Sequence, residues 1–515
     1  MRKFIIAHDL GTTGNKATVF DQHGCMLSHA FCSYTTEYAH VGWAEQSPDD
    51  WWHAVCESTQ RLLSVSAIPP SEVACLTFSG QMMGCVAVDR RARPLRNAMI
   101  WADTRAGAQV NWMSQQMDVH TLYRLTGHRL SSSYSLAKIL WLRDNEPELF
   151  HSTHKFLQAK DAIVARLTGE FVTDPSDASG TNLYDLECGT WSAQILAVAN
   201  LDVSLLPAIH ASTAVVGVVL SAVSAEVGIP AGTPVVIGGG DGACAAVGAG
   251  VIMQGTAYNY LGSSAWISLA SSQPVYDPAQ RVFTFAHLVP GLFAPMGTMQ
   301  AAGASYQWAR NQLGAAEVHG AAKSGMSAYE LLDHQAGLSP PGANGVLFLP
   351  YLLGERSPRW NPNARGAFLG LSIQHTRSDL LRAVLEGVAY NLRIILDVLI
   401  AQGASISTVR VIGGGAQGRL WNQILADVYN LPIYRLKLAE EATSMGAAVA
   451  GGIGVGLYSS WEMALQMNSV AETFVPDNSH SEIYKRRIDM FDQAYMALEP
   501  ISAQLADLAA GHYAR

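Results

Sequence analysis

The sequence predicts an α/β protein with two domains, and three observations support this prediction. Short β-branched runs alternate with stretches of helical periodicity along the chain, a pattern typical of α/β architecture. The chain has 515 residues, which is too long for one ordinary hydrophobic core. A unit of strand, glycine-containing turn and strand occurs near the start and again after residue 256, as expected for two similar halves.

The first half begins with two predicted strands, residues 4–8 and 16–21, separated by a glycine turn. A helix is predicted to begin after Ser47, because a Ser cap is followed by Pro48 and by two acids that favour the positive end of a helix dipole. Residues 233–237 predict another buried strand.

The second half repeats the pattern, with predicted strands at residues 257–261 and 265–269 around a Gly-Ser-Ser turn. We therefore place the domain boundary between residues 246 and 256, which gives domains of residues 1–250 and 251–515. From about Glu482 the pattern predicts one or two amphipathic helices packed on the outside.

The composition excludes several classes of protein. The net charge of −9 argues against nucleic acid or an anionic membrane as the main partner. The seven cysteines show no C-x-x-C pairing, so we expect reduced thiols and a cytoplasmic location. The apolar run at the start ends at Asp9 and is better explained as a first strand than as a signal peptide, and no stretch is long enough to span a membrane.

The first candidate site is Asp9 with the turn Gly11-Thr12-Thr13-Gly14. Such a turn can direct backbone N–H groups and Thr hydroxyls at phosphate oxygens, while Asp9 faces a magnesium ion through water. An ordinary hairpin with satisfied Thr side chains is the alternative. A carboxylate at a strand end is costly without a partner, which favours the phosphate site.

The second candidate is Asp241, which lies among four glycines at residues 238–242 and closes a β-branched strand. Its carboxylate could accept a proton from a hydroxyl nucleophile, and the alternative is a linking loop with a capping Asp. Two strand-end aspartates fit phosphoryl transfer, because one can help hold the metal while the other acts on the nucleophile.

The third candidate is the Gly-Gly-Gly-Ala-Gln-Gly segment at residues 413–418, between a predicted strand and a predicted helix. It fits G-x-G-x-x-G, and Glu440 and Glu441 follow at roughly the distance expected for a dinucleotide site. We identify no complete βαβ unit around it. An NAD-dependent oxidoreductase and a glycine loop lining an adenosine pocket both stay open at this point.

The fourth candidate comprises residues 79–84 and 101–105. Gln81, Trp101 and Asp103 supply an amide, an indole and a carboxylate, which suit a polyhydroxylated ligand. Met82 and Met83 are equally well explained by core packing. The chain contains no G-x-x-x-x-G-K-[ST] loop, no G-x-S-x-G elbow and no His/Cys metal cluster.

The whole pattern resembles the FGGY family of carbohydrate kinases over almost the full length. Residues 133–145 match the first family signature, residues 366–386 match the second, and residues 413–417 resemble the adenosine motif. The resemblance implies two actin-like (ribonuclease H-like) ATPase domains flanking a central cleft, with ATP as phosphate donor and Mg²⁺ as cofactor. It removes most of the support for an oxidoreductase, and it leaves a non-catalytic actin-like ATP-binding protein as a further alternative.

The resemblance also implies roles for individual residues. Asp241 would be the catalytic base, and Asp9 would be tied to the Mg–ATP phosphates, with the metal held through water. The implied nucleotide-binding residues are Gly11, Thr12, Thr13, Gly262, Ser263, Gly303, Gln307, Gly414, Gly415 and Ala416. The implied sugar-binding residues are Gln81, Met82, Met83, Trp101, Asp103 and Asp241.

Within the family, residues 42–46, 79–84 and 354–358 are most similar to those of xylulose kinases. The Arg-Glu pair that glycerol kinases carry near Gln81 is absent. Met83 stands where xylulose kinases have a histidine, and it lacks the strong hydrogen-bonding groups of that residue.

The expected reaction is therefore phosphorylation of D-xylulose at its terminal hydroxyl, with L-xylulose, ribulose, a pentitol or another polyol as alternatives. The expected partners are the sugar and ATP, without nucleic acid or membrane, and a homodimer stays an alternative to a monomer.

Overall fold

Two units make up the structure, a computed structural model that describes residues 2–513. Unit 1 contains the described residues up to Gln254 together with Ala270–Ala294 and Glu441–Asn468. Unit 2 contains Gly255–Leu269, Pro295–Glu440 and the described residues from Ser469 onward. The boundary predicted near residue 250 lies just before the first change of unit, and two later segments return to unit 1.

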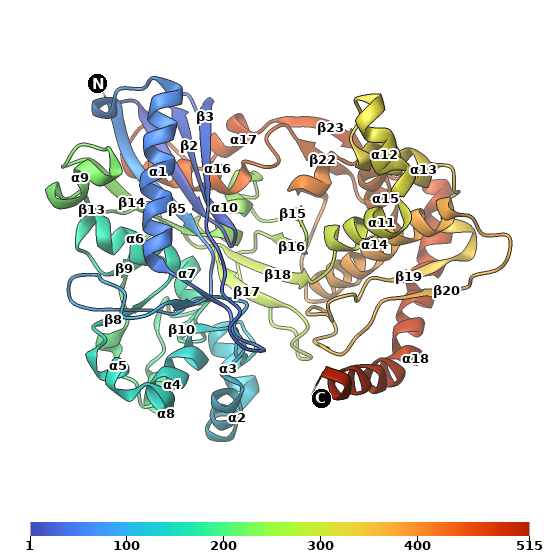
Figure 1. The fold of residues 1–515 in the computed structure, drawn as a ribbon, viewed down its shortest axis with the longest axis horizontal. Helices are drawn as coiled ribbons and strands as arrows, with labels where there is room; N and C mark the ends of the chain where they lie inside the picture. The colour runs from blue at the N-terminus through green and yellow to red at the C-terminus, as the bar shows by residue number, and fades with distance from the viewer. Residues whose placement is uncertain (1, 514–515) are drawn as a thin grey trace. The chain divides into compact units, whose positions relative to one another are not determined.

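Unit 1 is built on a six-stranded sheet with the order β13-β14-β5-β1-β2-β3 (Figure 1). Strands β14, β5 and β1 are mutually parallel at the centre, and the outer pairings are antiparallel. The strand bounds are β1 (Phe4–Leu10), β2 (Gly14–Asp21), β3 (Met26–Ser33), β5 (Val73–Gly80), β13 (Val215–Val218) and β14 (Pro234–Gly240). The strands predicted at 4–8, 16–21 and 233–237 are thus confirmed.

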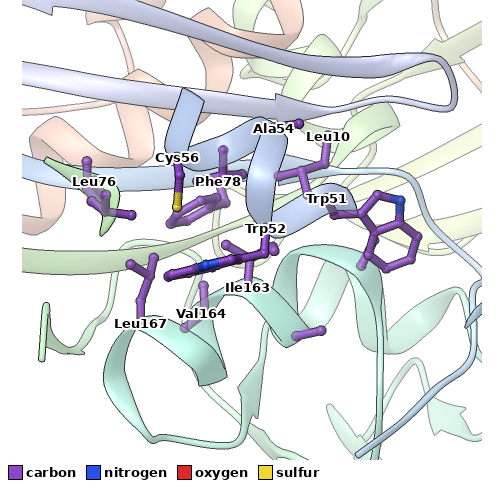
Figure 2. Close-up of a cluster of buried hydrophobic side chains, with 14 of the residues drawn as sticks. Leu10, Trp51, Trp52, Ala54, Cys56, Leu76, Phe78, Ile163, Val164 and Leu167 are labelled. Carbon is purple, nitrogen blue, oxygen red and sulfur yellow. The ribbon is translucent and has the colours of Figure 1, made fainter. Parts of the chain in front are cut away.

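Helices cover both faces of this sheet. Successive side chains of β5 point to opposite faces, and each set contacts different helices. Leu76 and Phe78 join a core cluster with α1 (Pro48–Ser66) and α6 (Ala159–Thr168). Figure 2 shows Trp52 of α1 lying over Ile163 and Val164 of α6 within that cluster. The intervening residue Thr77 turns to the opposite face, where its hydroxyl donates to Ala447 O of α16 (Ala442–Gly454). Every residue of β5 is therefore buried, as expected for a central parallel strand.

Helix α1 begins as its sequence predicts, because the Ser47 side chain accepts a hydrogen bond from the Asp50 N–H. The remaining helices of unit 1 are α2 (Gly107–Gln116), α3 (Val119–Thr126), α4 (Ser135–Asn145), α5 (Pro147–Ser152), α7 (Pro175–Ser179), α8 (Ala193–Ala199), α9 (Ser221–Val227), α10 (Asp241–Gly248) and α17 (Met463–Met467).

Unit 2 repeats the strand logic of unit 1. Strand β15 (Thr256–Leu261) pairs antiparallel with β16 (Ala265–Leu269) and parallel with β21 (Thr408–Ile412), as β1 pairs with β2 and β5. The neighbouring strands are β18 (Phe293–Met299), β22 (Ile433–Leu436) and β23 (Val470–Phe474). The duplication predicted from the two glycine turns is confirmed at the level of strand order.

The glycine-rich segment after β21 does lie within a βαβ unit, so the sequence-based interpretation was wrong on this point. Strand β21 leads into α15 (Arg419–Tyr429) and then into β22, which pairs parallel with β21. Strand β22 has only four residues. A run that short gives too little alternation to be identified from sequence.

Long helices form the remainder of unit 2. The 25-residue α14 (Arg377–Ala401) is largely buried and carries the second part of the second family signature, whose first part lies in and around β20 (Ala367–Leu369). One helix, α18 (Ser481–Tyr513), occupies the segment predicted to be helical from about Glu482. Its Tyr484 hydroxyl donates to Glu386 of α14. The other helices are α11 (Gly303–Leu313), α12 (Ala315–Ser324) and α13 (Ala328–Gly337).

Short two-stranded ladders complete the secondary structure. They pair β4 (Glu45–Gln46) with β7 (Ala98–Met99), β6 (Val86–Val88) with β8 (Lys155–Leu157), β9 (Val172–Thr173) with β12 (Ala208–Ile209), β10 (Tyr184–Asp185) with β11 (Thr190–Trp191), and β19 (Leu347–Leu349) with β20 (Ala367–Leu369). Strand β17 (Phe283–Ala286) lies in a segment that belongs to unit 1. Among the described residues, no helix combines the length and the apolar character that crossing a membrane requires.

Candidate active site

The carboxyl ends of the three central strands of unit 1 lie in line. Leu10 at the end of β1 pairs with Gly80 at the end of β5, and Gly80 pairs with Gly240 at the end of β14. The Gln81 N–H also donates to Leu10 O at 2.8 Å. Asp9, Gln81 and Asp241, which are far apart in the sequence, are therefore brought to one edge of one sheet, as ligand-binding residues commonly are in α/β folds.

Asp9 is partly buried near the end of β1, opposite Lys16 in the β1–β2 register. Burial raises the pKa of its carboxyl, and the charge of Lys16 offsets only part of that shift. Lys16 Nζ in turn lies 3.2 Å from Glu441 Oε2, so its charge is shared. A carboxylate in this setting is stabilised by an additional cation.

Asp241 is the first residue of α10, and its Oδ1 accepts a hydrogen bond from Gly242 N at 2.7 Å. Protein atoms surround the carboxyl on most sides, although part of the side chain stays accessible. Burial and the nearby charge of Asp9 raise the pKa of Asp241 to about 7. A carboxyl with this pKa can take up a proton near neutral pH, which is the property a general base needs.

The turn after Asp9 is held by side chains from other segments. Gly11 N donates to Gly14 O, which closes the turn at 3.0 Å. Gln46 Nε2 donates to Thr12 O at 2.7 Å, and Trp101 Nε1 donates to Thr12 Oγ1 at 3.0 Å. Thr13 stays exposed. The structure thus brings Trp101 to the turn, whereas Gln46, whose part in the site the sequence analysis missed, fixes the turn's backbone.

Residues of the first family signature (133–145) hold the loop from Gln81 to Gly84 in place through hydrogen bonds to its backbone. Lys138 Nζ donates to Met83 O at 2.7 Å, and Ser135 Oγ donates to Gly84 O at 2.6 Å. Gly84 N donates to Gln158 Oε1 at 2.9 Å. The signature residues Ser135 and Lys138 therefore act on the loop's carbonyl groups from within the protein.

Side chains of the same loop differ in what they face. Gln81 is buried and donates to Gln46 Oε1 at 2.8 Å, while its own Oε1 is buried without a hydrogen-bond donor among the described residues. Met82 packs so closely on Gly240 that a Cβ there would lie 2.6 Å from the Met82 sulfur. Met83 is partly exposed and has a φ of +63°, in the left-handed region.

Asp103 has no exposed surface. Its carboxylate accepts hydrogen bonds from Arg105 Nη2 at 2.6 Å and from Ala44 N at 2.8 Å. The Arg105 guanidinium also stacks on Trp43, 3.5 Å from the ring centroid. In this structure Asp103 orders the segment that carries Gln46, and its direct contact with a substrate stays a prediction.

In unit 2, the turn after β15 lies against the start of α11. A Cβ on Gly303 would lie 2.3 Å from Gly262 O, so only glycine allows this approach. Ala302 N and Ala304 N both donate to Ser263 O, at 2.9 and 3.0 Å. Gln307, one turn further along α11, is exposed.

The glycines after β21 pack on the end of β15. Gly413 has a φ of +86°, and a Cβ on it would lie 2.7 Å from Leu261 O. Gly414 is exposed with open space where a Cβ would be, whereas Ala416 is fully buried and its carbonyl accepts from Asn422 Nδ2 at 2.7 Å. This segment thus leaves backbone at Gly414 and Gly415 open to a ligand, whereas Ala416 has no exposed surface and both of its backbone polar groups are paired within the protein.

A polar pair near this segment had no signal in the sequence. Tyr306 OH donates to Asp333 Oδ1 at 2.7 Å, and a Cβ on Gly418 would lie 3.2 Å from Asp333 Oδ2. Burial raises the pKa of Asp333 to about 6. Both residues lie inside helices, where an isolated Tyr or Asp resembles any other helical position.

The carboxylates of unit 1 suit a magnesium ion that arrives with a nucleotide. Within the part of the chain that the structure describes, no group of three or more His, Cys, Asp or Glu side chains forms a metal-binding cage. Magnesium usually takes one or two carboxylates, substrate phosphates and water. Asp9 fits this requirement, because burial disfavours its charged form and a cation beside it would offset that cost.

The repeated strand order, the glycine turns and the strand-end aspartates define an actin-like, ATP-dependent kinase. The FGGY family of carbohydrate kinases matches the chain with its N-terminal domain at residues 4–248 and its C-terminal domain at residues 257–455. The chain belongs to this family. The predicted carbohydrate kinase activity and its ATP donor are confirmed, and the oxidoreductase alternative is excluded.

Relatives with known names agree with this assignment. The xylulose kinase of Bacillus subtilis is 32% identical over 98% of this chain and 99% of its own length. The gluconokinase of Bacillus licheniformis is 28% identical over 98% of each chain. The crystal structure of the xylulose kinase from Rhodospirillum rubrum superimposes with a TM-score of 0.87 at 31% identity, covering 97% of this chain and 100% of that one.

The buried ammonium of Lys138 generates a test of the loop from Gln81 to Gly84. In Lys138→Met, the carbonyls of Met83 and Ser133 lose a donor that lies 2.7 and 2.5 Å away, so the loop should lose its fixed position. We expect the KM for the sugar to rise by about tenfold, the equivalent of one buried hydrogen-bond partner lost, with little change in the KM for ATP. Steady-state kinetics of ADP release measure both constants.

Lys155→Met is the matched control, because Lys155 Nζ also donates to two backbone carbonyls, Ser204 O at 2.6 Å and Leu206 O at 2.8 Å. Neither of these carbonyls belongs to the loop from Gln81 to Gly84, so the variant should leave the sugar KM within about twofold of wild type. Equal sugar KM values for the two variants would contradict the role of Lys138.

Proposed function

We propose that the protein transfers the γ-phosphoryl group of Mg–ATP to the terminal hydroxyl of a ketopentose, with D-xylulose as the first candidate. The observation that carries this proposal is Asp241, a carboxylate with a pKa raised to about 7 at the edge of the sheet where Asp9 also lies. Family membership establishes the reaction class, ATP-dependent phosphorylation of a carbohydrate. The identity of the acceptor sugar and the roles of individual residues are what we propose.

In this mechanism the Asp241 carboxylate accepts the proton of the sugar hydroxyl as the hydroxyl oxygen attacks the γ-phosphorus. The bond between the γ-phosphorus and the bridging oxygen breaks, and ADP leaves with that oxygen. Magnesium, when bound, neutralises charge on the β- and γ-phosphates. Asp9 would hold the metal, and the hydroxyls of Thr12 and Thr13 would direct their donors at the phosphates. Gly11 would contribute by shaping the turn, which its N–H closes on Gly14 O.

Unit 2 supplies the other nucleotide contacts in this proposal. Backbone groups at the close approach of Gly262 and Gly303 face the phosphates, together with the exposed Ser263. Gly414 and Gly415 line the nucleoside, the buried Ala416 supports the turn that carries them, and Gln307 contributes from α11. The open space at Gly414 supports this assignment, because a nucleoside can approach the backbone there.

The sugar-binding residues that we propose are Gln81, Met82, Met83, Trp101, Asp103 and Asp241. The buried acceptor of Gln81 supports this, because a sugar hydroxyl would supply the donor that Oε1 lacks among the described residues. Met82 and Trp101 would contact the carbon chain, and Asp103 would act through the segment that it orders. We place the reaction in the cytoplasm, because all seven cysteines are free thiols.

The acceptor is tested by measuring ADP release with D-xylulose, L-xylulose, D-ribulose, xylitol, D-gluconate and glycerol. We expect kcat/KM to be highest for D-xylulose, because the segments around Gln81 and Met83 are most similar to those of xylulose kinases. Gluconate is included because a gluconokinase is among the relatives. A higher kcat/KM for gluconate or glycerol would refute the proposed acceptor while leaving the kinase assignment intact.

Met83→His sharpens the same test. Histidine tolerates the left-handed backbone at this position better than most residues and offers a hydrogen bond to a hydroxyl. We expect its preference for D-xylulose over the other sugars to rise by about tenfold, whereas Met83→Leu keeps the wild-type ranking.

Asp241→Asn tests the proposed base. The amide is nearly isosteric but cannot accept the proton, so we expect kcat to fall by about 10²–10⁴-fold with little change in ATP binding. ADP release and nucleotide titration by calorimetry measure the two effects. A variant that turns over at the wild-type rate would remove Asp241 from the mechanism.

A further inference from the structure

Unit 1 buries a lysine with three aspartates directly behind the strand ends of the site. Lys160 Nζ lies 2.6 Å from Asp161 Oδ1, 3.0 Å from Asp174 Oδ1 and 3.0 Å from Asp177 Oδ2, and all four side chains are 0% exposed. Lys160 Nζ donates a hydrogen bond to Asp161 Oδ1, and it forms ion pairs with Asp174 and Asp177. We call these four residues the Lys160 cluster.

Burying the four ionisable side chains of the Lys160 cluster carries a desolvation cost, so the cluster is a poor way to stabilise a fold. Burial opposes charge on Lys160, but the surrounding carboxylates raise its pKa well above the ordinary value and keep it protonated. Burial raises the pKa of Asp177 well above its usual range. Well-packed apolar side chains often stabilise a core as well as buried ions do, so a cluster like this one suggests a specific positional role.

Hydrogen bonds connect the Lys160 cluster to Asp241 through one serine. Ser176 Oγ donates to Asp174 Oδ2 at 2.5 Å and accepts a hydrogen bond from Gly240 N at 2.9 Å. The Gly240 N–H belongs to the residue that immediately precedes Asp241. Gly239 also passes so close that a Cβ on it would lie 2.8 Å from Ser176 Oγ.

The same cluster touches the neighbouring strand end. A Cβ on Gly80 would lie 3.0 Å from Lys160 Cβ, so the lysine stem packs against the residue that precedes Gln81. The Lys160 cluster therefore lies behind the ends of both β5 and β14.

We propose that Ser176 and the Lys160 cluster are positioning residues that hold Asp241 in the orientation for proton abstraction. This inference rests on the proposed role of Asp241 as the base. The fixed charge of Lys160 orients Asp174, Asp174 orients the Ser176 hydroxyl, and that hydroxyl fixes the peptide leading into Asp241. Without the last bond, the Gly240 N–H loses its buried acceptor and the carboxylate shifts from the line of attack.

The test compares Ser176→Ala with Ser212→Ala. Ser212 is buried, and its hydroxyl donates to the same oxygen, Asp174 Oδ2, at 3.0 Å. Among the hydrogen bonds of the described residues, only the Ser176 hydroxyl also accepts from Gly240. Each variant therefore removes one donor from Asp174, but only one of them releases the peptide before Asp241. These substitutions avoid changing Lys160, whose loss would leave three buried carboxylates and prevent folding.

We expect Ser176→Ala to lower kcat by about tenfold to a hundredfold, as small displacements of a reacting group do, with an unchanged KM for ATP. Ser212→Ala should keep kcat within about twofold, and the two variants should show similar thermal unfolding midpoints. Equal kcat values for the two variants would overturn the positioning role.

A double-mutant cycle with Asp241→Asn shows whether Ser176 acts through Asp241. We expect Ser176→Ala to cause no further loss of the residual rate of Asp241→Asn, because the group that it orients is gone. A further loss of the same factor would show an independent, merely structural effect. If Asp241→Asn itself keeps wild-type kcat, the proposed base fails; if that variant is impaired while Ser176→Ala matches Ser212→Ala, only the positioning role fails.

Discussion

The active site depends on holding two carboxylates at the ends of parallel strands, where burial opposes their charge. The register of β1, β5 and β14 aligns Leu10, Gly80 and Gly240, and so places Asp9 and Asp241 at one edge. Burial and the charge of Asp9 then raise the pKa of Asp241 to about 7. The strand order that creates this edge in unit 1 recurs in unit 2, where the ends of β15 and β21 lead into glycine-containing turns, which we propose bind the nucleotide.

Most of the polar residues that mark the family hold backbone in place. Gln46 and Lys138 donate to carbonyls of the two loops of the site, and Asp103 is saturated by Arg105 and Ala44. Rigid support of this kind lets a few exposed groups meet the substrate in a fixed geometry. Under the proposed function, the sugar preference is set at the partly exposed Met83, while the hydrogen bond from Lys138 to its carbonyl keeps the loop in place.

The sequence predicted the local features of the site well, because strands, glycine turns and a terminal carboxylate are each encoded within about ten residues. Asp9, Asp241 and the duplicated strand-turn-strand unit are examples. Features that depend on distant pairings were missed: the return of Glu441–Asn468 to unit 1, the saturation of Asp103, and the meeting of Lys160 with Asp174. No local pattern distinguishes a buried lysine on a helix from an exposed one until its tertiary partners are known.

Direct titration of Asp241 tests the central claim most closely. Protein labelled with ¹³C at the aspartate carboxyl carbons, free of nucleotide, would be followed by NMR from about pH 2 to about pH 9, a range that brackets both outcomes. The Asp241 signal would be assigned by its loss in Asp241→Asn. Burial beside Asp9 predicts a midpoint near 7, so that the carboxylate is a competent base above that pH and is protonated below it. A midpoint near 4, the ordinary value for an exposed aspartate, would contradict the account.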